Sequence, residues 1–313
     1  MTVRDLRASD APWLLEFLKK YFPEEEAILG TRPEGFTEVV RKVFRWQARL
    51  VLGFLRLVGR PVYRFFVVQA DGRTVATTLL TFSGASGYVS MVVVDPSYRH
   101  RGYARALLEK ARHATRARGR RYIVLDVLTA NRPARALYDS LGYRTLRETA
   151  IFVHERPSEA APAREPPPGL RSFHPRDAPA LAEVARRGRP PEVERVLPTA
   201  AREIAGSPTV DRVLTSESAA WVIEDASGPT AWVSASISPA TEAAHLSNPI
   251  VDASVPPDAA ETLVRTAVAW CATRRAPRVM AMAPAENERG RAALAAAGFR
   301  EAIPSLTLYR TVD

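Results

Sequence analysis

The sequence predicts two consecutive α/β domains, each built from a mixed, mostly antiparallel sheet flanked by helices. Three observations lead to this fold class. The 313 residues exceed one ordinary domain and suit two of about 150 residues each. The segment 156–169 contains five prolines and no apolar periodicity, as expected of a semi-rigid linker. Sequence patterns on its two sides also recur in the same order.

The recurrence involves three pairs of segments. "VRDLRASDAPWLLE" (3–16) matches "LRSFHPRDAPALAE" (170–183), and in each we expect the Asp-Ala-Pro triplet to begin a helix capped by Asp10 or Asp177. "VVVDP" matches "PIVDA", and "NRPARALYDSLGY" matches "NERGRAALAAAGF". We therefore predict a duplicated domain, with one copy in residues 1–155 and the other in residues 170–313.

In the first copy, antiparallel strands precede a strand–helix–strand–helix–strand unit, an order that places helices on both faces of a mixed sheet. Runs of β-branched and aromatic residues predict strands near 2–7, 62–69, 73–82, 87–94, 121–128 and 143–153. Apolar residues at helical spacing predict helices near 10–21, 36–58, 102–118 and 132–141.

The second copy has the same order of elements in a shorter form. Its expected strands lie near 219–224, 230–237, 244–251, 278–283 and 304–311. Its expected helices lie near 177–187, 191–205, 257–275 and 287–297.

The net charge of +10 is confined to the first copy. Residues 1–155 hold 26 Lys and Arg against 15 Asp and Glu, whereas residues 156–313 hold 18 against 19. Such a field attracts anions, either nucleic acids or phosphate-bearing small molecules. No nucleic-acid motif or base-stacking platform accompanies it, so we expect no nucleic-acid partner.

Cysteine usage and the N-terminal residues limit the remaining classes. The single cysteine, Cys271, cannot form an internal disulfide, and no Cys/His pairs occur at ligand spacing, so we expect no metal site. The charged stretch "MTVRDLRASD" does not resemble a signal peptide. We therefore expect a cytoplasmic protein.

The stretch "DPSYRHRGYARALLEKA" (95–111) joins a predicted strand to a predicted helix. The first turn of a helix has backbone N–H groups without partners and the positive end of the helix dipole. Gly102 would let a phosphate approach the chain closely, while Arg99 and Arg101 add charge. The stretch is thus either an anion site or simply a helix start with solvated arginines.

Two motifs carry a family resemblance. Arg99-x-x-Gly102-x-Ala104, after "VVVDP", resembles the coenzyme A loop of the GCN5-related N-acetyltransferases, the GNAT superfamily. "LDVLTANRPARALYDSLGY" resembles its second conserved stretch, with Asn131 and Tyr138 at the expected places. The resemblance implies acetyl-CoA as co-substrate, with its diphosphate on the amides of 100–105 and its pantetheine beside strand 87–94. The implied coenzyme-binding residues are Val92, Val94, Arg99, His100, Arg101, Gly102, Tyr103, Ala104, Arg105 and Asn131.

Acetyl transfer from a thioester to an amine needs a base, an oxyanion donor and an acid for the leaving thiolate. The resemblance implies Tyr138 as the acid, although a core tyrosine is the alternative. It implies the backbone N–H of Val92 as the oxyanion donor, on a splayed strand. Asp126 stands where some members carry a base acting through water. As the only polar side chain after Tyr122 in "YIVLDVL", it could instead be bound to a structural partner.

One departure from the family is that strand 87–94 lacks the glutamate that many members place there. Either Asp126 works alone or the amine arrives neutral. We expect direct transfer to a small-molecule or peptide amine in a ternary complex. The alternative is a non-catalytic acyl-CoA sensor or scaffold.

The second copy has lost these residues. Tyr138 corresponds to Leu294, Asp126 to Met282, and the loop to "PPDAAE". We therefore predict a degenerate GNAT-like domain that completes the structure, shapes the acceptor cleft or mimics a dimer. Cys271 is expected in a buried helix rather than as a nucleophile.

The apolar stretch 35–60 carries Arg41, Arg45 and Arg49 at helical spacing. It can be a helix packed on the sheet, a wall of the acceptor site, or a membrane-surface helix, of which we consider the last the least favoured. Its runs without charge are far shorter than the ~20 residues that a membrane span needs.

Overall fold

The computed structural model describes residues 1–21, 63–159, 165–205, 217–237 and 243–313. The expected helix 36–58 lies outside this range. In the first half, the observed elements agree with the expected ones to within a few residues. They are β1 (Thr2–Asp5), α1 (Ala11–Tyr21), β2 (Tyr63–Ala70), β3 (Arg73–Ser83), β4 (Ser86–Val94), α5 (Tyr103–Arg116), β5 (Tyr122–Leu128), α6 (Arg132–Ser140) and β6 (Arg144–His154).

The second half repeats this order. Its elements are β7 (Leu170–Ser172), α7 (Ala178–Arg187), α8 (Pro191–Val196), α9 (Ala201–Ala205), β8 (Glu217–Asp225), β9 (Gly228–Ile237), β10 (Ala244–Leu246), β11 (Ile250–Val251), α11 (Pro257–Thr273), β12 (Val279–Pro284), α12 (Glu288–Ala296) and β13 (Arg300–Thr311).

Two elements of this half were expected to be continuous, and this expectation is wrong for both. The expected helix 191–205 is divided in two at Pro198, which has no N–H to donate to the helical ladder. The expected strand 244–251 is interrupted at Pro249 for the same reason.

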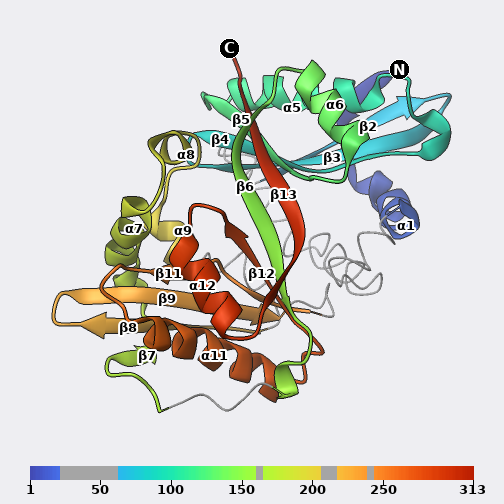
Figure 1. Cartoon of the computed structure of the whole chain (residues 1–313). Coiled ribbons are helices and arrows are strands. Elements are labelled where there is room, and N and C mark those ends of the chain that lie inside the picture. Colours follow the sequence, from blue (N-terminus) through green and yellow to red (C-terminus); the bar gives the residue numbers. More distant parts are fainter. Residues whose placement is uncertain (22–62, 160–164, 206–216, 238–242) are drawn as a thin grey trace.

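One continuous sheet joins the two halves. Its strand order is β1-β2-β3-β4-β5-β13-β6-β12-β10-β9-β8-β7, with β11 paired to β9. The last strand of the chain, β13, thus lies between β5 and β6 of the first half, and β6 in turn pairs with β12 of the second half. Figure 1 shows these two strands, β6 in green and β13 in red, running side by side from one half to the other. We call this arrangement the strand exchange.

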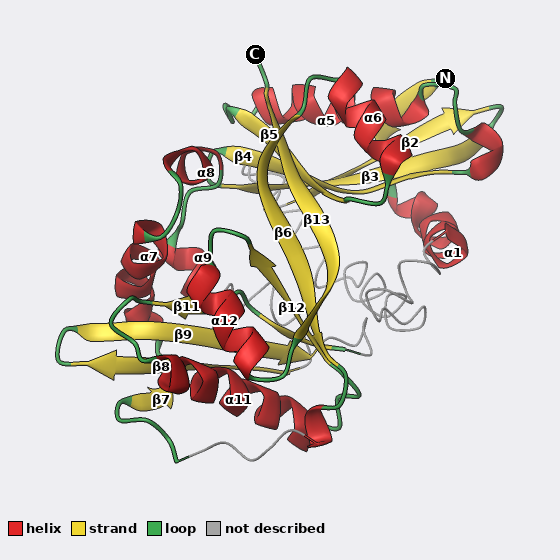
Figure 2. Ribbon diagram, viewed as in Figure 1, coloured by secondary structure: helices red, strands yellow, loops and turns green. Residues whose placement is uncertain are grey.

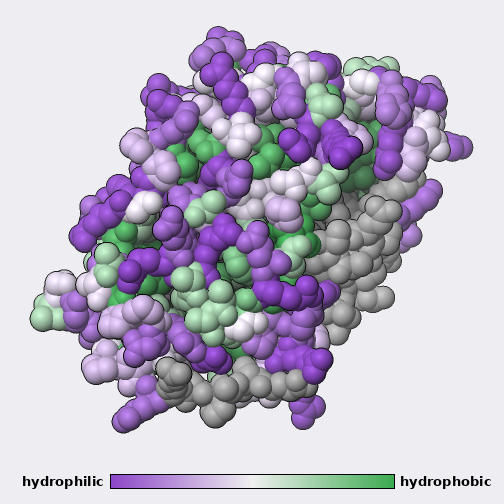
Figure 3. Space-filling view, viewed as in Figure 1, coloured by the Kyte–Doolittle hydropathy of each residue, from purple (hydrophilic) through white to green (hydrophobic). Residues whose placement is uncertain are grey.

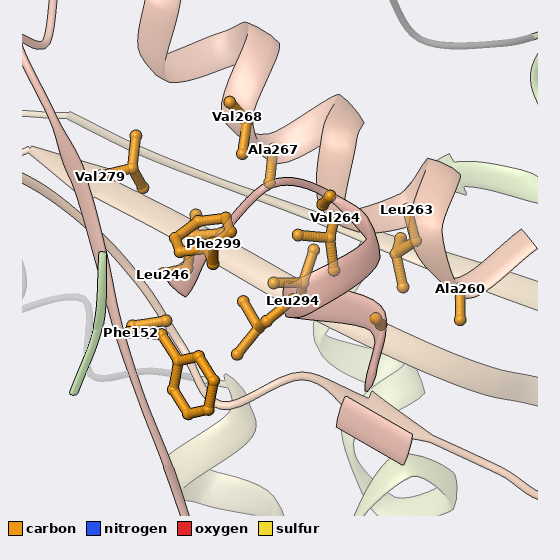
Figure 4. Close-up of a cluster of buried hydrophobic side chains, with 14 of the residues drawn as sticks. Phe152, Leu246, Ala260, Leu263, Val264, Ala267, Val268, Val279, Leu294 and Phe299 are labelled. Carbon is orange, nitrogen blue, oxygen red and sulfur yellow. The ribbon is translucent and has the colours of Figure 1, made fainter. Parts of the chain in front are cut away.

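The apolar cores follow the strand exchange. Leu308 of β13 is 3% exposed and belongs to the core of the first half, beneath α5. Phe152 of β6 is 4% exposed and belongs to the core of the second half. Figure 4 shows Phe152 beside Leu294 of α12 and the apolar face of α11. Each half therefore completes the hydrophobic core of the other.

Helices cover the outer faces of the sheet in both halves. α5 and α6 lie along one face of the first half, and α11 and α12 lie along the corresponding face of the second (Figure 2). The surface seen from the same side is mostly hydrophilic, with apolar side chains in small areas between charged ones (Figure 3).

The structure shows the internal repeat in a pair of equivalent ion pairs. Arg4 contacts Asp10 at 2.6 Å in the first half, and Arg171 contacts Asp177 at 2.8 Å in the second. The expected helix-capping role is wrong for Asp177, which is the N-cap residue of α7 but makes no side-chain capping hydrogen bond to it, whereas for Asp10 it stays a prediction. Each carboxylate accepts from the backbone N–H three residues earlier, that of Arg7 or His174, and so closes the turn before the helix.

The division of the chain at 156–169 stays a prediction. The strand exchange makes the first copy depend on residues near the C-terminus, so that neither copy contains its complete sheet.

Candidate functional site

The predicted coenzyme loop lies between β4 and α5. Asp95 ends β4, and its carboxylate accepts from the N–H of Ser97 at 2.9 Å, which fixes a short 3-10 turn at 96–98. Gly102 then adopts φ +80°, a left-handed conformation that disfavours other residues, and α5 begins at Tyr103. The expected start at Gly102 was one residue early.

The backbone N–H groups of residues 100–105 form an open row at the start of α5. They have no acceptor anywhere in the described part of the chain. A Cβ built on Gly102 would meet nothing within 4 Å, so the space over these amides is open. The dipole of the 14-residue helix α5 adds a positive potential at the same place. Such a row of amides at a helix start is suited to a phosphate or diphosphate group.

Arginine side chains surround this row of amides. Arg99 and Arg101 are exposed, and each donates to a backbone carbonyl of the turn, at 3.3 Å to Val94 and 3.2 Å to Ser97. Arg105 donates to Ser140 of α6 at 2.8 Å. Their positive charges are thus held close to the open amides.

β4 separates from β5 beyond its midpoint. The parallel pairing of β4 with β5 ends at Val89. Met91 has φ +56°, and the register with β3 shifts between Ser90 and Val93, which is the geometry of a β-bulge. The splay that the family resemblance implies is therefore present, and Val92 lies within the bulge. The side chains of Val92 and Val94 are partly buried against the first core.

Asp126 is bound by two hydroxyl groups on the opposite face of the sheet from α5. Its Oδ1 accepts from Thr307 of β13 at 2.7 Å, and its Oδ2 accepts from the phenol of Tyr88 of β4. Burial, and then the negative charge of Asp126, raise the pKa of Tyr88 well above its ordinary value. Tyr88 therefore remains a hydrogen-bond donor to the carboxylate at physiological pH.

The polar row continues across the exchanged strands. Arg147 of β6 lies 3.5 Å from the hydroxyl of Thr307 and forms an ion pair with Glu286 at 3.3 Å. Asp126 is thus connected to the second half through β13. Sequence reasoning missed both partners of Asp126, because Tyr88 and Thr307 lie 38 and 181 residues away from it along the chain.

Tyr138 lies on α6 and is 7% exposed. Its ring centroid is 5.8 Å from that of Tyr143, and both belong to the core cluster against which Val92 packs. Asn131 is the N-cap of α6, where its side chain accepts from the N–H of Ala134 at 3.2 Å. Among the described residues, its amide N–H₂ group has no acceptor.

The corresponding loop of the second half offers few amides. α11 begins with Pro257 after Pro256, and neither residue has an N–H group. The N–H of Ser254 is taken by the carboxylate of Asp252 at 3.0 Å, and Asp258 adds a negative charge in the first turn. The row of open amides found at 100–105 is therefore absent from the described residues of this loop.

Asn287, the counterpart of Asn131, closes the second half further. It caps α12 in the same manner, but its amide group also donates to Asn248 at 2.6 Å and to the carbonyl of Pro249 at 2.7 Å. These contacts hold α12 against the break between β10 and β11. The side-chain amide group that is open in Asn131 is thus hydrogen-bonded in Asn287.

Cys271 is fully buried in α11, as expected. Burial raises the pKa of its thiol to about 12, so that it is protonated and unreactive at neutral pH. In the described residues, no group of three His, Cys, Asp or Glu side chains is placed to hold a metal ion.

Comparison with known proteins agrees with this geometry. Residues 16–143 match the Acetyltransferase (GNAT) family. The first half of the chain is therefore similar to this family. A segment of 149 residues is 30% identical to an uncharacterised N-acetyltransferase of Methanocaldococcus jannaschii, and this match covers 45% of our chain and 60% of that protein.

Solved structures extend the GNAT likeness over the whole chain. A tandem GNAT protein from the clavulanic acid biosynthesis pathway has a TM-score of 0.64 at 19% identity, covering 100% of our chain and 98% of its own. A GCN5-related N-acetyltransferase from Sphaerobacter thermophilus also has a TM-score of 0.64, at 17% identity, with 99% and 95% covered. These similarities establish the fold, a tandem GNAT arrangement.

No helix among the described segments is long and apolar enough to cross a membrane.

Proposed function

We propose that the protein is an acetyl-CoA-dependent N-acyltransferase that passes an acetyl group directly to an amine in a ternary complex. The observation that supports this most strongly is the row of open amides at 100–105, which continues into the splay between β4 and β5. The amides would bind the diphosphate, and the splay would accept the pantetheine arm. Asn131 would help to position that arm.

Three residues would carry the chemistry. Tyr138 would protonate the leaving thiolate of coenzyme A, and the N–H of Val92 would stabilise the oxyanion. Asp126 would accept the proton of the amine through water, with its carboxylate oriented by Tyr88 and Thr307. The acceptor is a small-molecule or peptide amine. A cytoplasmic location and the degenerate character of the second half remain predictions.

Binding of coenzyme A is the first test, measured by calorimetry on the full chain. Gly102→Ala places a methyl group over the open amides, in a conformation that costs about 1–2 kcal/mol for a non-glycine residue. We expect at least a tenfold loss of affinity, equivalent to ~1.4 kcal/mol. Gly119→Ala is the matched control, because Gly119 has φ +63° and equally open surroundings at the other end of α5. Equal affinities in the two variants would refute the site.

A second candidate is a non-catalytic acyl-CoA sensor or scaffold. It is favoured by the burial of Tyr138 and by the two hydroxyl donors already on Asp126. Thiol release from acetyl-CoA, measured with a panel of amines, separates the two candidates. Release that depends on an amine supports the enzyme, and its loss in Tyr138→Phe supports the proposed acid. Coenzyme binding without release for any amine would favour the sensor.

A further inference from the structure

A cavity of about 560 Å³ lies between the two halves, away from the coenzyme loop. The first half contributes Ser83, Tyr88 and Arg147 to its wall. The second half contributes residues of α7 and α9 and the break between β10 and β11. Its volume is typical of pockets that bind small molecules.

The cavity is on the face of the first-half sheet opposite α5. Ile123 and Leu125 of β5 belong to the same core cluster as Leu107 of α5, so the alternate residues of β5 point the other way. Asp126 is one of these, and Tyr88, which lines the cavity, donates to it. The cavity therefore borders the Asp126 carboxylate but is separate from the row of open amides.

Two arginines in the cavity wall, Arg147 and Arg189, have donors to spare. Arg189 donates to Thr199 and lies 3.4 Å from Glu194, but its Nε and Nη2 have no acceptor in the part of the chain described. The Nη2 of Arg147 has none there either. Burial, and then the positive charge of Arg147, lower the pKa of Arg189. An anion between the two guanidinium groups would offset this repulsion.

Carboxylates balance the charge of the cavity wall. Glu286 is paired with Arg147, whereas Glu203 of α9 accepts from Ser83 of the first half and forms no salt bridge within the described segments, although its charge acts on Arg189. The lining thus combines spare guanidinium donors with an exposed carboxylate that lies within electrostatic range of Arg189. A ligand with both a carboxylate and an ammonium group matches this distribution better than a simple anion or cation.

The rest of the wall is apolar. Leu197, Ile204, Ile250 and Val251 contribute to it. Trp232 also lines the cavity, and its indole N–H has no hydrogen-bond partner among the described residues. Binding of a ligand with an apolar body would therefore remove from water the apolar surface of both the ligand and the cavity wall.

We propose that this cavity binds a zwitterionic amino acid or short peptide with an apolar side chain, with its carboxylate between Arg147 and Arg189 and its ammonium group near Glu203. The inference goes beyond the proposed acetyl transfer, because it concerns a second site. The amino acid or peptide bound there need not be the amine that accepts the acetyl group.

Three related probes test the charge pattern. Phenylalanine has both charges, N-acetylphenylalanine only the carboxylate, and phenylalaninamide only the ammonium group. Binding to the full chain without acetyl-CoA is measured by ligand-observed NMR at up to ~10 mM probe, enough to detect a millimolar Kd. We expect phenylalanine to bind at least about threefold more tightly than either derivative, and Arg189→Gln to weaken its binding about tenfold.

Matched variants separate the site from the fold. Arg187→Gln is the control, because Arg187 is an exposed α7 residue that pairs with Asp252 and does not line the cavity. Ala185→Phe fills the cavity without removing a charge and should abolish binding with little change in circular dichroism. Coenzyme A affinity should be unchanged in every variant, which keeps this test separate from that of the proposed function.

The inference is overturned if phenylalaninamide binds as tightly as phenylalanine, or if none of the three probes binds. It is also overturned if Ala185→Phe, while folded, retains the affinity of the native chain.

Discussion

Leu308→Ala tests whether the strand exchange makes the two halves one cooperative unit. Leu308 is 3% exposed in the core of the first half, although it belongs to the last strand of the chain. Its truncation should cost about 2–5 kcal/mol, the range for a buried leucine whose site cannot fully collapse. Native domains are stable by only about 5–15 kcal/mol, so the loss is large enough to measure.

The assay reports on the half whose core does not contain Leu308. In a background of Trp13→Phe and Trp46→Phe, all remaining tryptophans lie in the second half. Urea unfolding followed by their fluorescence should show a single transition, with a midpoint lowered to the same extent as that measured by circular dichroism. Thr311→Ala, at an exposed position of the same strand, should change stability by less than about 0.5 kcal/mol. A fluorescence midpoint unaffected by Leu308→Ala would refute the coupling.

Three further predictions concern other parts of the molecule. Cys271 should give no reaction with a thiol reagent in the native protein and one equivalent after denaturation; a native reaction would contradict its raised pKa. The pKa of Asp177 is lowered in the folded protein, chiefly by its hydrogen bonds from Arg171. The ionised carboxylate therefore stabilises the fold at pH values above its unfolded pKa of about 4. This stabilisation is lost as the pH falls through the folded pKa. Asp177→Asn should therefore be destabilising at pH 7 and nearly neutral at pH 2 in urea unfolding, and an equal effect at both pH values would disprove this linkage. Calorimetry should find one coenzyme A per chain, since Pro256 and Pro257 remove amides from the second loop, and two sites would contradict this reading.

The geometry of the loop between β4 and α5 could be predicted from the sequence because it is local. Asp95, Gly102 and the start of α5 lie within a few residues of one another, and a left-handed glycine before a helix is visible in the sequence pattern. The same holds for the internal repeat, which appears again in the Arg4–Asp10 and Arg171–Asp177 pairs.

The strand exchange and the surroundings of Asp126 could not be predicted in this way. A strand such as 300–311 has the same alternating pattern whether it pairs within its own copy or with β5 of the other. The partner of Asp126, Thr307, is set by that pairing alone. The inter-half cavity likewise depends on which faces the exchanged strands bring together. Sequence reasoning therefore predicted the loop at 95–105 and the candidate residue Asp126, but not the contribution of the second half to the surroundings of Asp126.

The position of β13 also affects the order of events during synthesis. Until residues 300–311 have left the ribosome, β5 and β6 each lack a neighbour on one side, and the nascent chain presents unpaired backbone along both. Such edges favour aggregation and chaperone binding. A chain that stopped before residue 300 would therefore be left with a gap in its sheet, although all of residues 95–105 would be present.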